Sequence, residues 1–118
     1  MPEQEMYAVL HCEPCDACAH DDRQSVEDGQ LSWESSYVCT RYDVRRRDRG
    51  RGVPPPWIRD RIVEREGTVH LPVGGPHGVP IAVLRRVYGL TVAELVAARK
   101  TGHRATPVEA RYLSGPTP

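Results

Sequence analysis

The chain has 118 residues with 16 basic and 16 acidic side chains, so its formal net charge is zero, and 39% of its residues are hydrophobic. A domain of this size buries a modest fraction of its surface, and we therefore expect a bound metal or a partner to supply part of its stability. No apolar run approaches the ~20 residues that cross a membrane, and the start of the chain, MPEQEMY, lacks the basic and apolar regions of a secretion signal. These features predict a cytoplasmic protein with no membrane partner.

The zero net charge divides into two opposite halves. Residues 1–40 hold nine acidic side chains and one basic one, Arg23, which gives −8, whereas residues 41–118 hold 15 basic and seven acidic ones, which gives +8. Such an asymmetry indicates two structural units or a polarised surface. The predicted organisation is an acidic cysteine-rich module over residues 1–44, an Arg/Pro-rich linker over 45–56 and a small helical domain over 57–118.

The first module is predicted to be a small antiparallel sheet. Apolar and β-branched side chains predict strands over residues 6–12, 21–27 and 30–39. Asp28-Gly29, between the last two, is a two-residue hairpin signal. Ser35-Ser36 interrupts the alternation of the third strand and predicts a β-bulge.

All four cysteines lie in this module, three at C-x2-C-x2-C spacing and one 21 residues later: Cys12, Cys15, Cys18 and Cys39. Thiolates are good ligands for Zn²⁺, and a turn of two intervening residues directs both sulfurs to one ion. His20 is the alternative fourth ligand. Four protein ligands leave no position for water, so we expect structural Zn²⁺ rather than a catalytic ion. An iron–sulfur cluster, disulfides and thiols without metal are the alternatives.

Over residues 5–45 this arrangement resembles a zinc ribbon. The resemblance implies that Cys12 and Cys15 form the first knuckle and that a hairpin returns Cys39 to them. A zinc ribbon closes with a second C-x2-C, whereas Tyr42 stands where the partner of Cys39 would be. The fourth ligand is therefore open between Cys18 and His20.

The linker is rich in arginine, with interspersed Asp and Gly ahead of three consecutive prolines. Arginines spaced in this way contact phosphates and give salt-dependent affinity. We therefore assign nucleic-acid binding to five residues, Arg45, Arg46, Arg47, Arg49 and Arg51. The alternative is a solvated linker that pairs with the acidic module.

Beyond the linker, apolar periodicity and stop signals predict four helices and one strand. The helices are expected over residues 57–66, 80–88, 92–101 and 107–113, and the strand over 68–73.

Two of these helices begin with a capping box, in which Thr91 precedes Glu94 and Thr106 precedes Glu109. In the helix after Thr91, the apolar spacing predicts an inner face that consists of Val92, Leu95 and Val96.

Two resemblances concern this part of the chain. Residues 84–95, with their Gly-Leu-Thr turn, resemble the start of a helix-turn-helix DNA-binding domain. The strand–helix–helix–helix order from residue 68 also resembles the C-terminal domain of the bacterial ribosomal stalk protein, a family that binds protein factors. The alternative is a helical hairpin that closes a core. Four further arginines are expected as secondary phosphate contacts, namely Arg85, Arg86, Arg104 and Arg111.

The sequence contains neither a Ser/His/Asp arrangement nor a phosphate loop, so we predict no enzyme activity and no small-molecule substrate. The expected fold is α+β: a small antiparallel zinc-ribbon-like sheet followed by a compact helical body with one added strand. The expected function is a non-enzymatic zinc-binding protein that acts as a nucleic-acid-associated regulator. The alternative is a protein-binding adaptor, or an antitoxin or immunity partner. Its acidic module, with Trp33 and Tyr37, would mask a basic target through carboxylates such as Asp21 and Asp22.

Overall fold

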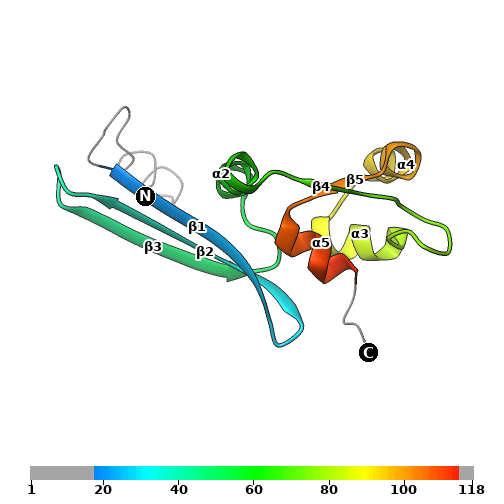
Figure 1. The fold of residues 1–118 in the computed structure, drawn as a ribbon, viewed down its shortest axis with the longest axis horizontal. Helices are drawn as coiled ribbons and strands as arrows, with labels where there is room; N and C mark the ends of the chain where they lie inside the picture. The colour runs from blue at the N-terminus through cyan, green and yellow to red at the C-terminus, as the bar shows by residue number, and fades with distance from the viewer. Residues whose placement is uncertain (1–17, 115–118) are drawn as a thin grey trace.

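The structure, a computed structural model, describes residues 18–114. In this part of the chain a three-stranded antiparallel sheet is followed by four helices and a two-stranded sheet, so the predicted α+β class is confirmed. Figure 1 shows the larger sheet at one end of the molecule and the helices at the other, along a longest dimension of 53 Å. The strand predicted over residues 6–12 lies outside the described residues.

The larger sheet has the strand order β1-β2-β3. Its strands are β1 (Cys18–Glu27), β2 (Gln30–Cys39) and β3 (Val44–Arg51). The sequence had indicated the first two, although β1 begins three residues earlier than expected.

The hairpin between β1 and β2 has the predicted two-residue turn. Asp28 and Gly29 both have positive φ angles, 53° and 74°, which is the conformation that a type I′ turn requires. The β1–β2 pairing then continues through Ser35 and Ser36 without interruption, so the predicted bulge is wrong. The Ser35 hydroxyl donates a hydrogen bond to a buried carboxylate oxygen of Asp22, which lets a serine occupy the buried face of a regular strand.

The predicted linker is wrong over residues 45–51, because these residues belong to β3. The strand pairs with β2 from Ser32↔Arg51 to Cys39↔Val44. Its side chains alternate between the two faces of the sheet, which places Arg46 on one face and the other four arginines on the opposite one. Long charged side chains are well suited to the solvent side of an edge strand. Composition therefore indicated an irregular segment where cross-strand pairing produces a regular one.

The four described helices agree with the sequence prediction. They are α2 (Pro56–Glu66), α3 (Ile81–Tyr88), α4 (Val92–Thr101) and α5 (Pro107–Leu113). None of them is long and apolar enough to cross a membrane.

Both predicted capping boxes are present. Thr91 and Thr106 each accept a hydrogen bond from the backbone N–H of the glutamate three residues later, Glu94 and Glu109, and each glutamate accepts one from the threonine N–H. These local bonds satisfy donors that a helix start would otherwise leave without partners.

The smaller sheet consists of β4 (Val69–Leu71) and β5 (His103–Ala105), which pair antiparallel. The sequence predicted the first of these as a longer strand over residues 68–73 and did not predict the second. A strand of three residues is too short to show an alternating pattern, which is why the sequence did not indicate β5. The helical body therefore has two short strands where one was expected.

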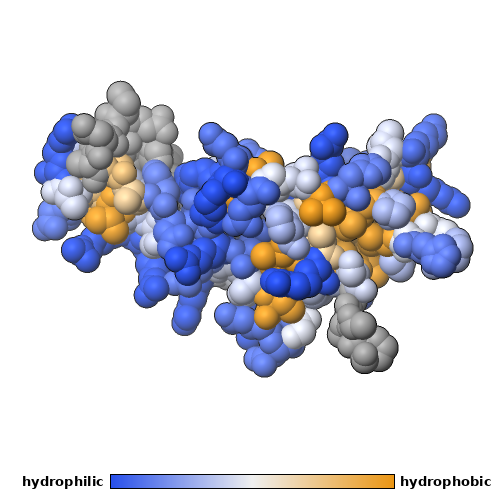
Figure 2. All heavy atoms as spheres, viewed as in Figure 1, coloured by the Kyte–Doolittle hydropathy of each residue, from blue (hydrophilic) through white to orange (hydrophobic). Residues whose placement is uncertain are grey.

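The helices enclose the main apolar core, and Figure 2 shows hydrophobic residues gathered on the surface of the helical part. In α4 this core includes Leu95 and Ala98, but Val92 and Val96 are 74% and 51% exposed, so the predicted inner face is wrong for these two valines. The buried cluster consists of Val79, Leu84, Leu95, Ala98, Ala105, Ala110 and Leu113.

Candidate functional site

The three-stranded sheet has two faces of different chemical character. Side chains alternate along a strand, and the register of the three strands assigns each residue to one face. The inner face packs toward α2 and α5 and includes the buried residues Asp22, Leu31, Ser35, Tyr37 and Cys39. We call the opposite one the open face, and its β3 residues are Arg45, Arg47, Arg49 and Arg51.

The arginines of the open face form a row along the edge strand β3. All four are exposed, and alternate residues of a strand lie ~6.7 Å apart, so the row extends over about 20 Å. Arg46, the fifth predicted contact, lies on the inner face, where its Nε is 2.9 Å from a carboxylate oxygen of Asp48. The structure therefore brings four of the five predicted residues together and separates the fifth from them.

Acidic side chains partly balance this row. Glu34 on β2 forms an ion pair of 2.8 Å with Arg47, and Asp21 on β1 forms one of 3.1 Å with Arg23. With Glu27, the described open face has five arginines and three acids, a net charge of +2. Exposed ion pairs are weak because water and salt screen them, so a phosphate can compete for these arginines.

A groove with a volume of about 760 Å³ lies at the hairpin end of this sheet. Arg23, Ser32, Arg49 and Arg51, all on the open face, are among its lining residues. The groove therefore adjoins the end of the arginine row, and its walls contain hydroxyl, guanidinium and carboxylate groups.

The two described cysteines are neighbours across the sheet. Cys18 and Cys39 are partners in the β1–β2 register at the end remote from the Asp28-Gly29 turn. Cys39 is fully buried, and the Cys18 Sγ lies 3.3 Å from the Tyr37 hydroxyl. His20 is exposed and lies on the same face as Cys18, with its ring centroid 4.9 Å from that of Tyr37.

The predicted metal site is only partly covered by the structure. Cys12 and Cys15 lie outside the described residues, which leaves Cys18, Cys39 and the alternative ligand His20. Among residues 18–114, no group of three or more His, Cys, Asp or Glu side chains is arranged to hold a metal ion. The zinc site therefore stays a prediction.

Asp22, which the sequence suggested as a contact for a basic partner, is buried inside the fold. It is 2% exposed, and Arg61 donates to both of its carboxylate oxygens, at 2.8 and 3.2 Å. Ser35 donates a third hydrogen bond at 2.6 Å, and Arg65 donates to the Asp22 carbonyl. Burial raises the pKa of Asp22, but the hydrogen bonds from Arg61 and Ser35 outweigh this effect and hold it below its usual value. Asp22 therefore joins β1 to α2 and is not available to a partner.

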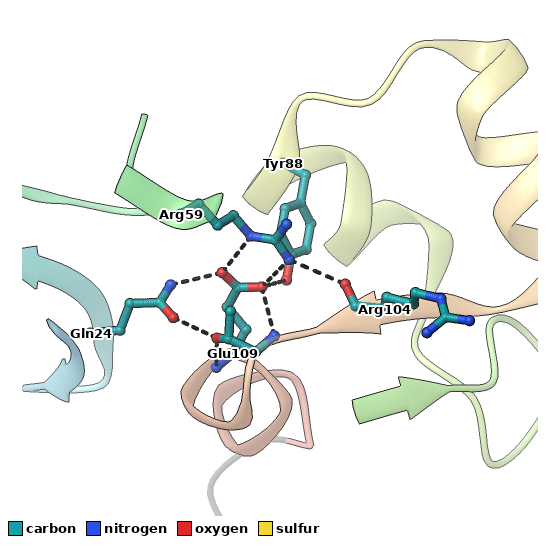
Figure 3. A network of polar contacts seen from close by, with 6 residues as sticks. Gln24, Arg59, Tyr88, Arg104 and Glu109 are labelled. Carbon is teal, nitrogen blue, oxygen red and sulfur yellow. Dashed lines mark hydrogen bonds and ion pairs between the residues drawn. The ribbon is translucent and has the colours of Figure 1, made fainter. Parts of the chain in front are cut away.

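Glu109 is the centre of a second buried network, shown in Figure 3. Its side chain is fully buried and accepts two hydrogen bonds from Arg59, of 2.8 and 3.0 Å. Gln24 and Tyr88 donate at 2.7 and 2.9 Å, and Arg59 also donates to the carbonyl of Arg104 at 3.2 Å. One carboxylate thus connects β1, α2 and α3 to α5.

The electrostatics of this network follow from its burial. Burial raises the pKa of Glu109, but the hydrogen bonds from Arg59 and Gln24 outweigh it, and the pKa is lowered overall. Burial and the neighbouring Glu109 charge raise the pKa of Tyr88, so this hydroxyl keeps its proton and acts as a donor. The arrangement therefore stabilises a carboxylate between donors that come from three other elements of the fold.

Sequence reasoning identified Glu109 as a capping residue and missed its second role. A signal was present in α2, where Arg59, Arg61 and Arg65 alternate with the buried Ile58 and Ile62. Arginines beside buried positions of a short helix need polar partners: Arg59 binds the Glu109 carboxylate and Arg61 the Asp22 carboxylate, whereas Arg65 donates to the Asp22 carbonyl. Which carboxylates they meet depends on contacts between residues far apart in the chain.

Comparison of the chain with protein families, with curated proteins and with solved structures finds no match. The resemblances to a zinc ribbon, a helix-turn-helix domain and the ribosomal stalk protein therefore stay predictions, and the function is argued from the residues alone.

Proposed function

We propose that this protein is a non-enzymatic regulator that binds nucleic acid through the open face of its three-stranded sheet. The observation that carries the proposal is the row Arg45, Arg47, Arg49 and Arg51, which is exposed on one face of a single strand. Four guanidinium groups on a regular strand are an arrangement suited to a polyanion.

The chemistry of arginine supports phosphate as the contacted group. Guanidinium groups present several N–H donors in a planar fork that matches phosphate oxygens, and they stay charged at any physiological pH. Each phosphate contact releases counterions, so binding to the open face should weaken steeply as salt increases. The ion pair of Arg47 with Glu34 is exposed and offers only modest competition.

We further propose a structural Zn²⁺ bound by Cys12, Cys15, Cys18 and Cys39, with His20 as the alternative fourth ligand. The adjacency of Cys18 and Cys39 in the β1–β2 register supports this, since it supplies two thiolates from distant parts of the chain at one place. Bound zinc would crosslink the end of the sheet that lies away from the helices. A cytoplasmic location belongs to the same proposal, because thiolate ligands stay reduced there.

The nucleic-acid proposal is tested by two quadruple variants with equal loss of charge. One replaces Arg45, Arg47, Arg49 and Arg51 by Gln. The other makes the same replacement at four of the exposed arginines of the helical part, Arg85, Arg86, Arg104 and Arg111. Binding to a labelled duplex DNA is measured by fluorescence anisotropy between about 50 and 200 mM salt. We expect the first variant to lose binding and the second to keep most of it. Equal losses would mean that total charge, rather than the open face, governs binding.

The zinc proposal is tested by native mass spectrometry and by melting in the presence of a chelator. We expect one zinc per chain and a lower melting temperature once the metal is removed. A Cys39→Ser variant should lose the zinc, whereas His20→Ala should keep it if Cys18 is the fourth ligand. A Cys15→Ser protein with unchanged zinc content and melting temperature would contradict the site.

A further inference from the structure

The aromatic residues of the sheet lie on its inner face, although Trp33 also lines the groove at the hairpin end, where its indole packs against Gly50. The three strands β1, β2 and β3 contain one tryptophan, Trp33, and one tyrosine, Tyr37, and both lie on the inner face. Tyr37 is 2% exposed, and the Trp33 indole lies so close to Gly50 that a Cβ there would be 2.8 Å from its Nε1. Proteins that bind single strands stack successive bases on aromatic side chains. The open face offers no such platform within its strands.

The arginine row is rigid and regular. Every residue from Val44 to Arg51 pairs with β2, so the four guanidinium groups project from a fixed backbone. A duplex turns once in about 34–36 Å, so over the ~20 Å of the row each of its strands winds more than halfway round the axis, and the row crosses phosphates of both strands. A duplex holds its phosphates at fixed positions and thus matches a fixed row, whereas a flexible single strand would have to be ordered first.

The acidic residues of the open face set the side on which the ligand lies. Glu34 is on the middle strand, and Asp21 and Glu27 are on β1, whereas β3 has no acidic residue on this face. Because Arg23 offsets one of the two acids of β1, the open face of β1 has a net charge of −1, whereas that of β3 has +4, which makes the outer strand the line of contact for phosphates.

We propose that the ligand is duplex DNA, held by its phosphates along β3 without base stacking. This inference rests on the proposed nucleic-acid function and narrows it to one class of ligand. Base-edge contacts from the serine and glutamine side chains of β1 and β2 are not needed for affinity, so binding is largely independent of sequence.

The test compares a duplex of about 12 base pairs, twice the length of the row, with one of its strands alone, using the full chain and fluorescence anisotropy. We expect the duplex to bind about tenfold more tightly at ~50 mM salt, with a log–log salt slope near −3.6 from four phosphate contacts. The double variant R45Q/R49Q should lose about two contacts and bring the slope to about −1.8. A second duplex of unrelated sequence should bind within about threefold of the first.

Tyr42 provides the control for stacking. It is 64% exposed in the turn between β2 and β3, beside the start of the arginine row. We expect Tyr42→Ala to bind either probe as the unchanged chain does, whereas a stacking role would weaken single-strand binding about tenfold. Tighter binding of the single strand, or a tenfold loss with Tyr42→Ala, would overturn the duplex inference and leave the proposed function standing. Failure of both probes to bind at low salt would overturn the proposed function itself.

Discussion

The two faces of the three-stranded sheet hold the same kinds of charged group in opposite roles. On the inner face, the carboxylate of Asp22 is 2% exposed and is held by Arg61 through two hydrogen bonds. On the open face, Arg47 and Glu34 form an ion pair of similar length, 2.8 Å, but their side chains are 75% and 45% exposed. Distance alone does not distinguish these pairs. Burial decides that the first is part of the fold and that the second can be exchanged for a ligand.

The largest expected effect is on the buried network of Glu109. Glu109→Ala removes the partner of Arg59 and leaves this guanidinium half-buried beside Tyr88 with one charge uncompensated. Breaking a buried pair by removal of one member typically costs about 3–5 kcal/mol, which is a large part of the stability of a small domain. The measurement is urea unfolding followed by circular dichroism.

Glu94→Ala is the matched control, because Glu94 occupies the same position in the capping box of α4 but is exposed. Its loss should cost about 0.5–1 kcal/mol, the contribution of the cap alone. If the two variants were equally stable, the buried network would contribute nothing beyond helix capping.

The next largest effect is expected at Asp22, and its neighbour Asp21, on the opposite face of the sheet, is the control. Asp22→Asn weakens two charge-assisted bonds from Arg61 at a buried position, and we expect a loss of about 2–3 kcal/mol. Asp21→Asn removes only an exposed pair with Arg23 and should change the free energy of unfolding by less than about 0.5 kcal/mol. Equal losses measured by urea unfolding would show that burial does not distinguish these faces.

Acid should weaken the buried pairs of Asp22 and Glu109. The pKa values of Asp22 and Glu109 are lower in the folded chain than their usual values, although burial acts in the opposite direction. The unfolded chain therefore takes up protons first, so the stabilisation is complete near neutral pH and is lost as the pH falls below about 4. Melting temperatures measured from pH 7 to pH 3 should fall, and Asp22→Asn should reduce the decrease. An identical profile for the variant would mean that Asp22 is not linked to the transition.

The sequence predicted well those features that depend on a few adjacent residues. The Asp28-Gly29 turn and the Thr91 cap each arise from side chains within four positions of one another, and both are present. The strand β3 was missed because its structure comes from pairing with β2, which composition does not show. The role of Glu109 was missed for the same reason, since its partner Gln24 is 85 positions away.

For the candidate site, composition identified the right residue type but not its geometry. The arginine run was assigned to nucleic acid as a set of five, whereas strand alternation divides it into four exposed residues and Arg46, which faces Asp48. Burial of Asp22 likewise could not be seen in a segment rich in acidic residues. In both cases the missing information is which face of the sheet a side chain occupies.

The smallest effects on stability should give the sharpest test of the difference between the two faces of the sheet. Arg45 and Arg46 are adjacent in the chain, but their side chains lie on opposite faces. Arg45→Gln replaces an exposed side chain and should change the free energy of unfolding by less than about 0.5 kcal/mol. It should also remove one phosphate contact, which lowers the steepness of the salt slope by about 0.9. Arg46→Gln deprives Asp48 of a partner where the Arg46 and Asp48 side chains are only 16% and 24% exposed, so it should cost about 1 kcal/mol and leave the slope unchanged. The two variants carry the same change of charge, so a crossed pattern, with stability lost in one and salt dependence in the other, can come only from the face that each arginine occupies. Parallel changes in both properties would place the binding surface elsewhere.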